Sequence, residues 1–314
     1  MNGVLLVDKS IGPTSHDVVA KVRRALGIRS IGHAGTLDPM ASGLLVLLVG
    51  EATKISDYLL NGDKAYEFVV RLGIRTDSMD MTGVILEEAP AETLSRLTEA
   101  EVQSAVMAMA GTLELQVPVH SAVKVNGKKL YEFAHRGDVP EDVPVREMSF
   151  YDIELRRWSP ATFEATVHLR SSKGSFIRAW GNELGRRLGV GGSVAVLRRT
   201  ESQPFHVGQA ISVETLQERW EARASRSGEC LGSAWVELPE ALPHFLRLEI
   251  EGQDVKLMRN GQISKALQAE LLRHIKLGEA PRPVRVINSE EGRLLALLIA
   301  QPGEFYKIRR VFVD

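Results

Sequence analysis

Hydrophobic and polar positions in the first fifty residues predict a strand, a helix and a second strand. Residues 4–7 form a short apolar run, and Gly12-Pro13 then marks a turn. Thr14 or Ser15 is placed to cap a helix that extends to about Leu26. A glycine-rich loop, residues 32–43, leads into the apolar run 44–49, which indicates a buried strand.

The rest of the chain combines the alternating pattern of strands with the 3.6-residue spacing of helices. Residues 66–72, 150–155 and 163–169 are β-rich, whereas 98–109 and 177–188 have helical spacing, the latter ending at Gly189. Residues 221–243 combine charges, serine, glycine and two prolines, and a new β-rich pattern starts at Leu246. We therefore expect an α+β fold with a mixed, largely antiparallel sheet and a domain boundary near residue 245.

Composition narrows the class of protein. The chain has 314 residues, 44% hydrophobic and 25% charged, which is typical of an ordinary globular protein of about two domains. Its four N-terminal apolar residues fall short of the roughly 7–15 of a signal peptide, and no apolar run approaches the roughly 20 that span a bilayer. A single cysteine, Cys230, excludes intrachain disulfides and cysteine-rich zinc sites. These features predict a cytoplasmic protein without a membrane segment.

The net charge of −1 would argue against a polyanionic partner, but the basic residues are clustered. Residues 256–285 carry a local balance of +5. Any one basic pair is most simply a solvated surface, so only the clustering suggests RNA. Adjacent pairs occur at Arg23-Arg24, Lys128-Lys129, Arg186-Arg187, Arg198-Arg199 and Arg309-Arg310.

Common cofactor signatures are missing. Gly189-Val190-Gly191-Gly192 follows a helix where a dinucleotide fingerprint follows a strand, and Val194 replaces its last glycine. The sequence contains no Walker loop and no His-Glu-x-x-His motif. Asp77 and Asp80 lack the alternating acids of a calcium loop and indicate a hairpin turn instead. No cofactor and no metal are predicted.

The loop at residues 32–43 is unusual in content. Its glycines permit close approach to a ligand, and Asp38-Pro39 fixes a turn that projects a carboxylate, although this spacing alone also suits a plain turn. The loop resembles the G-H-x-G-x-L-D-P-x-A-x-G signature of the TruB family of tRNA pseudouridine synthases. That family resemblance implies that Asp38 is the catalytic carboxylate.

Further motifs follow in the family's order over residues 3–200. They are residues 5–9 with Gly12 and 14–15, then 64–66 and 71–73 with 76, 77 and 80, then 116–118, 121–124 and 127–131, and finally 174–178 and 197–199. The sequence departs from the pattern at Ser10, Val119, His120 and Phe176, where proline, proline, tyrosine and tyrosine are usual. Phe176 would keep stacking but lacks a hydroxyl, which leaves Tyr66 as the only aromatic hydroxyl among the matched pocket residues.

The resemblance assigns a role to each matched pocket residue. Tyr66 would stack on a flipped uracil and take part in proton transfer at C5, and Arg178 would pair with Asp38 and keep it ionised. Without the motif, Tyr66 is a half-buried strand tyrosine and Arg178 a surface arginine at a helix start. His33 would lie close to the flipped nucleotide, and Leu197 would form an apolar wall, a role that ordinary core packing explains nearly as well.

The resemblance also implies an architecture and a substrate. Residues 1–245 would form the catalytic domain, and 246–314 a small PUA-like β-barrel that binds RNA. The substrate would be the T-loop uridine at position 55 of tRNA, gripped by an insertion at about 124–146, with weaker contacts from Lys124, Lys128, Lys129 and Arg199. No obligatory protein partner is expected, and the chain is expected to be a monomer.

Three alternatives stay open at this point. The first is a guide-RNA-dependent pseudouridine synthase, against which the insertion at 124–146 argues. The second is an RNA-binding or tRNA-folding factor, although binding alone gives no reason to present Asp38, Tyr66 and Arg178 together. The third is a hydrolase of a small molecule, whose turnover need not weaken with salt as RNA binding does. The chemical route, by attack at C6, attack at C1′ or a glycal, is also open.

Overall fold

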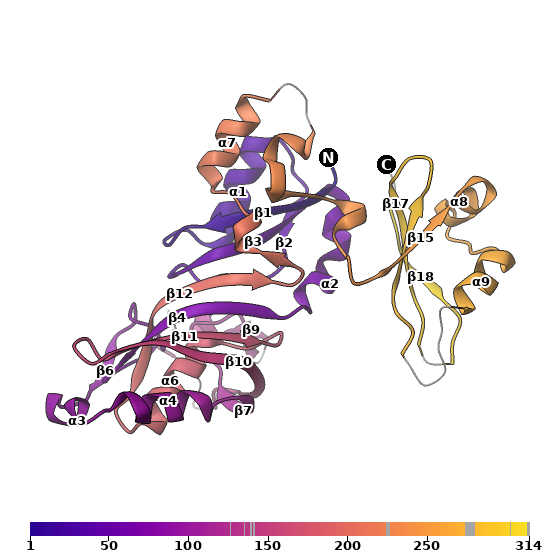
Figure 1. The fold of residues 1–314 in the computed structure, drawn as a ribbon. Helices are drawn as coiled ribbons and strands as arrows, with labels where there is room; N and C mark the ends of the chain where they lie inside the picture. The colour runs from indigo at the N-terminus through magenta and orange to yellow at the C-terminus, as the bar shows by residue number, and fades with distance from the viewer. Residues whose placement is uncertain are drawn as a thin grey trace.

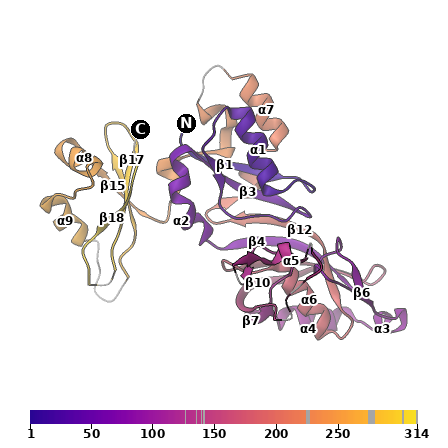
Figure 2. The ribbon, with the colours of Figure 1, turned by 180° about the vertical axis from the view of Figure 1, so that it is seen from behind.

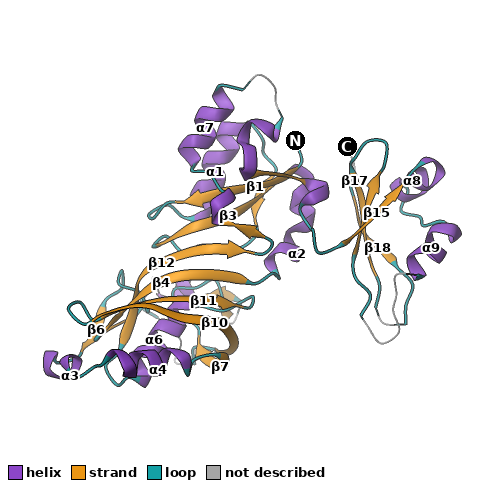
Figure 3. Ribbon diagram, in the orientation of Figure 1, coloured by secondary structure: helices purple, strands orange, loops and turns teal. Residues whose placement is uncertain are grey.

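The computed structural model describes residues 1–125, 127–134, 136–138, 140, 142–223, 227–273, 280–301 and 303–312. Its centre is a mixed sheet in which the β12–β3 pairing is parallel and the other pairings are antiparallel. The predicted α+β class is thus confirmed (Figures 1 and 3). In sheet order the strands are β14 (Trp235–Glu237), β1 (Gly3–Lys9), β3 (Ala41–Val49), β12 (Gly192–Ser202), β4 (Lys64–Leu72), β11 (Glu164–Ser171), β10 (Val145–Ser159) and β7 (Gly111–Gln116), with β2 (Ile31–His33) on β3 and β13 (Phe205–His206) on β12.

Helices gather at two ends of this sheet. Helices α1 (Ser15–Leu26) and α7 (Val213–Glu221) lie beside β1, and α4 (Glu99–Met107) and α6 (Ile177–Arg187) lie beside β10 and β7, as Figures 1 and 2 show. The remaining short helices are α2 (Ser56–Leu60), α3 (Ala91–Ser95), α5 (Leu130–Ala134) and the 3₁₀ turns Gly50–Ile55, Val207–Gln209, Gly228–Ala234 and Leu238–Glu240.

Helix α1 forms where the sequence predicted it. Thr14 caps it by accepting a hydrogen bond from the Asp17 amide, while the Asp17 carboxylate accepts one from the Thr14 amide. Gly27 ends the helix in the left-handed conformation. The helix buries Val18, Val22 and neighbouring residues against the sheet. Residues of this segment therefore determine both where the helix ends and which face is buried.

Strand β4 places its side chains alternately on the two faces of the sheet. Tyr66 and Phe68 are buried on one face, whereas Glu67 between them is exposed on the other. Phe68 packs edge-on against Trp180 of α6, with ring centroids 5.3 Å apart. Helix α6 therefore covers the face of the sheet that carries Tyr66.

The C-terminal part has its own sheet in the order β15 (Leu246–Ile250), β16 (Val284–Asn288), β17 (Leu294–Ile299) and β18 (Lys307–Val311). Helices α8 (Gly252–Arg259) and α9 (Lys265–Leu272) accompany it. The β-rich pattern predicted from Leu246 is present, but among the described residues β15 and β18 stay unpaired edges, so the expected closed barrel is not found. Residues 274–279, 302, 313 and 314 of the predicted domain lie outside the described residues.

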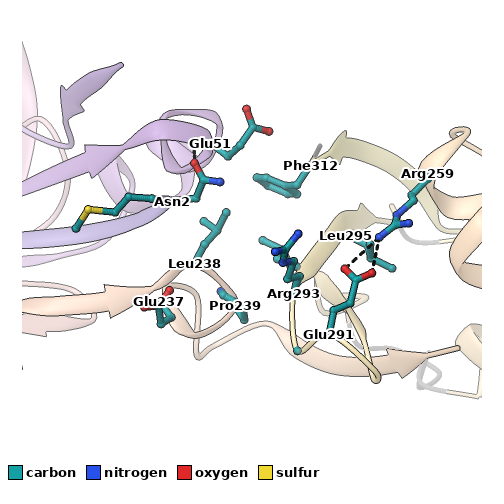
Figure 4. A pocket seen from close by; sticks show the side chains of 13 residues that line it. Asn2, Glu51, Glu237, Leu238, Pro239, Arg259, Glu291, Arg293, Leu295 and Phe312 are labelled. Atoms are coloured by element: carbon teal, nitrogen blue, oxygen red, sulfur yellow. Dashed lines mark hydrogen bonds and ion pairs between the residues drawn. The ribbon is translucent and has the colours of Figure 1, made fainter. Parts of the chain in front are cut away.

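The two sheets share an apolar seam. Ile287, Leu297 and Phe312 of the C-terminal part belong to the same buried cluster as Leu44 and Leu48 of β3. Above the seam lies a crevice of about 710 Å³, between Asn2 and Leu238 on one side and Phe312 on the other. Figure 4 shows this crevice, whose outer rim holds the Arg259–Glu291 ion pair at 3.0 Å.

None of the helices formed by the described residues has both the length and the hydropathy needed to cross a membrane.

Helix α6 approaches the turn that follows it closely. A Cβ on Gly185 would lie 2.1 Å from the Gly191 carbonyl carbon and 2.1 Å from the Gly192 amide nitrogen. Both are backbone atoms, which cannot move aside as a side chain can. Only glycine at position 185 lets α6 lie this close to β12.

Gly185→Ala should therefore destabilise the fold, although alanine normally favours a helix over glycine by about 1 kcal/mol. We expect the free energy of unfolding to fall by about 2 kcal/mol, because overpacking displaces α6. Urea denaturation measures this. Gly32→Ala is the matched control, since its methyl meets nothing nearer than Thr53 Cγ2 at 4.0 Å. Equal stability of the two variants would contradict the close-packing argument.

Candidate active site

The loop between β2 and β3 is held by hydrogen bonds that fix Asp38 in space. The Ser15 hydroxyl donates to the Leu37 carbonyl at 3.0 Å and accepts from the Leu37 amide at 2.9 Å. The Gly12 amide donates to the Pro39 carbonyl at 2.9 Å. Residues on both sides of Asp38 are thus anchored to the start of α1 and the turn before it.

Lys9 supports the same loop from beneath. Its side chain is buried, and its ammonium donates to the Pro13 carbonyl at 2.9 Å and to the Pro39 carbonyl at 3.5 Å. Burial lowers the pKa of Lys9, while the negative charge of Asp38 acts in the opposite direction. Lys9 is therefore a loop support, a role that the sequence motif did not reveal.

Arg178 is the centre of the polar network. Its Nε lies 2.9 Å from Asp38 Oδ2, and its Nη1 lies 3.4 Å from Asp80 Oδ2. The same guanidinium donates to the Ser78 carbonyl at 3.0 Å and to the His120 carbonyl at 2.8 Å. Its side chain is only 4% exposed, so Arg178 is not the surface residue that a helix start alone would suggest.

Asp80 is a site residue whose role the sequence reasoning missed. It lies in the turn between β5 (Ile74–Thr76) and β6 (Ile85–Glu88), which confirms the predicted hairpin. The carboxylate of Asp80 accepts from the Ser78 hydroxyl and from the Thr82 amide, both at 3.0 Å. The unusual acid pair Asp77 and Asp80 in one turn was the available signal, but only the fold brings it to Arg178.

An open pocket of about 420 Å³ lies in front of this network. Its walls unite five of the six predicted pocket residues, namely Asp38, Tyr66, Phe176, Arg178 and Leu197, with Lys124 at the margin. His33 is not among the lining residues, nor are Lys128 and Lys129. The pocket is completed by Thr36, Leu37, Ser121, Ala122, Val123, Arg146, Ser175 and Ile177.

Asp38 is the exposed end of the network. Its side chain is 37% exposed, in contrast to 4% for Arg178 and 5% for Asp80. The guanidinium stabilises an ionised carboxylate, because it supplies both an opposite charge and a hydrogen-bond donor. The arrangement therefore offers an anionic oxygen to whatever enters the pocket.

Arg199 corrects one prediction. We expected it to contact tRNA, but its side chain is buried and points under the loop. Its Nε donates to the Leu44 carbonyl at 2.8 Å, and its two Nη atoms donate to the carbonyls of Thr36 and Gly35 at 3.3 and 3.2 Å. Its guanidinium also interacts electrostatically with the hydroxyl of Tyr66, its partner across β12 and β4.

The predicted insertion forms a small projection beside the pocket. Strands β8 (Lys124–Val125) and β9 (Lys128–Lys129) pair as a hairpin, and α5 follows at once. Lys124 and Lys128 are exposed, and Lys129 lies 5.5 Å from the ring centroid of Tyr131. Residues 126, 135, 139 and 141 of this insertion lie outside the described residues.

His33 lies next to the loop. Its ring packs edge-on against His16, with centroids 5.5 Å apart, and its buried Nδ1 has no hydrogen-bond partner within the described part of the chain. Burial lowers the pKa of His33, and the positive charges of His16 and Arg199 lower it further. The imidazole is thus neutral at pH 7.

No group of three or more histidine, cysteine, aspartate or glutamate side chains among the described residues could hold a metal ion.

Two family models match the chain. One, described as "TruB family pseudouridylate synthase (N terminal domain)", covers residues 23–177, and the other, "tRNA pseudouridylate synthase B C-terminal domain", covers 178–242. A tRNA pseudouridine synthase B of Bdellovibrio bacteriovorus is 44% identical over 99% of this chain and 97% of its own length. The corresponding protein of Syntrophobacter fumaroxidans is 36% identical over 99% and 97%.

A solved structure shares the fold. A chain of an H/ACA ribonucleoprotein bound to a substrate RNA containing 2′-deoxyuridine superposes with a TM-score of 0.70. Its sequence is 20% identical, and the match covers 99% of this chain and 85% of that one. At this identity the likeness concerns the fold alone.

The neutral state of His33 is directly testable. Its NMR titration midpoint should lie below 6.5, and His16→Asn should raise it by removing one neighbouring positive charge. Because the folded-state pKa is lowered, this residue should reduce folding stability only as the pH falls below about 6.5. A midpoint at or above 6.5 would contradict the burial argument.

Proposed function

Because the chain belongs to the TruB family of tRNA pseudouridine synthases, we propose that it isomerises a uridine of tRNA to pseudouridine, and that this uridine is position 55 of the T-loop. One observation carries the proposal. It is the exposed carboxylate of Asp38, paired at 2.9 Å with a buried Arg178 and facing a pocket of about 420 Å³. The family relationship and the site geometry support the proposal independently.

The reaction breaks the bond between N1 of uracil and C1′ of ribose, turns the base, and forms a bond from C1′ to C5. A base in a folded tRNA loop must first leave its stack and enter a pocket. Asp38 is the nucleophile in this proposal. Attack at C6, attack at C1′ and removal of a sugar proton all require an ionised carboxylate at this position, so Arg178 serves each route.

Arg178 fixes the geometry as well as the charge. Its nitrogens are committed to Asp80, to the Ser78 carbonyl and to the His120 carbonyl, so the guanidinium cannot follow the substrate. Asp38 is the more exposed partner and is the one that reaches the ribose or the base. A rigid cation behind a more accessible anion is suited to a covalent step.

Tyr66 is the stacking residue of the proposal. Its hydroxyl interacts with Arg199, and in that interaction a guanidinium can act only as the donor. The turned base must lose a proton at C5, and in this proposal the Tyr66 hydroxyl relays it, its oxygen accepting the C5 proton while its own proton passes to water. Phe176 lines the same pocket without a hydroxyl, and Leu197 is the apolar wall against the uracil.

RNA binding extends beyond the pocket in this proposal. Lys124 lines the pocket margin, and the exposed Lys128 and the half-buried Lys129 follow on the hairpin that would grip the T-arm. Residues 1–245 would act as the catalytic domain and 246–314 as a small PUA-like RNA-binding domain. The exposed cations of β18 support the second assignment, because they suit a phosphate backbone. The chain would act on tRNA as a monomer, without a protein partner.

Asp38→Asn should abolish pseudouridine formation while leaving tRNA binding within about twofold, because the amide keeps the shape but cannot act as a nucleophile. Carbodiimide-dependent stops of reverse transcription on an unmodified tRNA transcript locate the product, and filter binding gives the affinity. The exposed Asp57→Asn is the matched control and should stay active. A fully active Asp38→Asn enzyme, or a product at another uridine, would refute the corresponding part of the proposal.

Arg199→Lys should lower kcat about 10- to 100-fold, or roughly 1.4 to 2.7 kcal/mol, with little change in KM. Lysine keeps the charge but cannot hold Tyr66 and three carbonyl groups at once. Single-turnover kinetics measure the loss. The neighbouring Arg198→Lys is the control, because Arg198 instead pairs with Asp8 at 2.7 Å, and it should stay within about twofold. An equal loss in both variants would mean that the effect is not specific to Arg199.

A further inference from the structure

A second pocket, of about 770 Å³, lies at the ends of β4 and β12. Its wall includes Arg170 and Glu201, which both pair with Ala65 in the sheet. Ala65 precedes Tyr66 on β4, so its side chain points to the opposite face. This pocket is therefore separate from the catalytic one, and neither the family motifs nor the proposed function uses it.

Aromatic rings dominate the lining of this second pocket. Tyr58 of α2 packs edge-on against Phe245, with centroids 5.3 Å apart, and His244 packs against the same ring at 4.9 Å. Phe205 and His206 of β13 complete the set, together with Pro204 and Pro283. Phe205 and Phe245 are buried, so the rings that a flat ligand can meet are those of Tyr58, His206 and His244, which come from three separate segments.

The polar groups at the rim are donors. Asn61 Oδ1 accepts from Lys173 at 3.0 Å, and Gln203 Oε1 accepts from the Asp63 amide at 3.3 Å, so the NH₂ group is the remaining polar group of each amide. His206 Nδ1 accepts from the Gly208 amide at 3.0 Å, which leaves Nε2 as the other ring nitrogen. Glu201, the carboxylate in the wall, is engaged by Arg170. The rim suits an acceptor-rich ligand.

Cations surround the rings. Arg309 and Arg310 of β18 act electrostatically on Tyr58, whose pKa is raised by burial against their influence. Arg282 lies beside His244 and donates to its carbonyl at 3.1 Å. All three arginines are exposed, and within the described residues none of them forms an ion pair with a carboxylate. Stacking surfaces, donors and unpaired cations together match a base attached to a phosphate.

One loop connects the two pockets. Lys173 reaches Asn61 at the second pocket, while Ser175 and Phe176 in the same loop line the catalytic pocket. An RNA strand that leaves the catalytic pocket over this loop therefore meets the second pocket without crossing the apolar core.

We propose that the pocket formed by Tyr58, Asn61, Gln203, His206 and His244 binds an unpaired nucleotide of the tRNA substrate, with its base on the rings and its phosphate near Arg309 and Arg310. The proposal rests on the proposed function for the identity of the RNA. In this proposal the pocket makes a second contact with the RNA, which anchors the RNA while the uridine is in the catalytic pocket. It adds affinity, not chemistry.

The test replaces the two donor amides with carboxylates. Asn61→Asp with Gln203→Glu keeps the oxygens that accept from Lys173 and Asp63, yet removes both NH₂ donors and adds two negative charges. The matched control, Gln103→Glu with Gln217→Glu, adds the same charges on exposed faces of α4 and α7. Tyr58→Leu removes one ring, and thermal melting checks that each variant is folded.

Affinity for tRNA and for an isolated T-arm hairpin is measured by filter binding at one salt concentration. The double variant should weaken tRNA binding about tenfold, and Tyr58→Leu about fivefold, as expected for lost stacking and donor contacts. The control pair should stay within about twofold, and kcat at saturating tRNA should be unchanged. Weakening for both RNAs places the nucleotide in the T-arm, whereas weakening for tRNA alone places it elsewhere in the tRNA.

Unchanged affinity for both RNAs in folded variants would overturn the proposal. Uridine monophosphate, titrated by NMR, tests the other source of the same chemistry. If it binds in this pocket while tRNA affinity does not depend on the pocket, the site serves a free nucleotide and the RNA assignment fails. Pseudouridine formation is measured on the same samples, so a wild type that binds tRNA through this pocket but makes no product would refute only the proposed function.

Discussion

The site depends on the burial of one guanidinium. A buried cation is stable only when opposite charge and hydrogen-bond acceptors surround it, and Arg178 finds these on three separate segments. The Asp38 loop, the Asp80 hairpin and the chain at His120 must all reach the start of α6 at once. The need to satisfy Arg178 therefore ties the catalytic loop to parts of the chain that are up to 140 residues away in the sequence.

A second buried arginine performs the corresponding task beneath the loop. Arg199 binds the carbonyls of Gly35, Thr36 and Leu44 and also the hydroxyl of Tyr66, so the loop and the stacking residue share one support. Arg178 fixes the position of the Asp38 carboxylate, and Arg199 fixes the backbone of the loop that carries it. This division explains how a glycine-rich loop keeps a defined conformation around a partly exposed acid.

Much of this was predictable from the sequence, for identifiable reasons. Local signals predicted α1, because its cap and its terminal glycine lie within the helix's own segment. The motif predicted the residues of the pocket, since Asp38, Tyr66 and Arg178 all reach it. The role of Arg199 was not predictable, because burial depends on which strand covers it. The expected barrel failed for a similar reason, since alternation indicates strands but not whether the outer strands of a sheet meet.

The order of the segments along the chain has a consequence for synthesis. Asp38 and Tyr66 belong to the first quarter of the protein, whereas both arginines that hold them come after residue 177. A ribosome that has made half of the chain has therefore made the carboxylate without Arg178 and the loop without Arg199, although Lys9 and Ser15 are already present. Since N-terminal segments emerge first, the site cannot mature progressively. It forms in one late step, when α6 and β12 arrive, so truncated chains lack the site altogether.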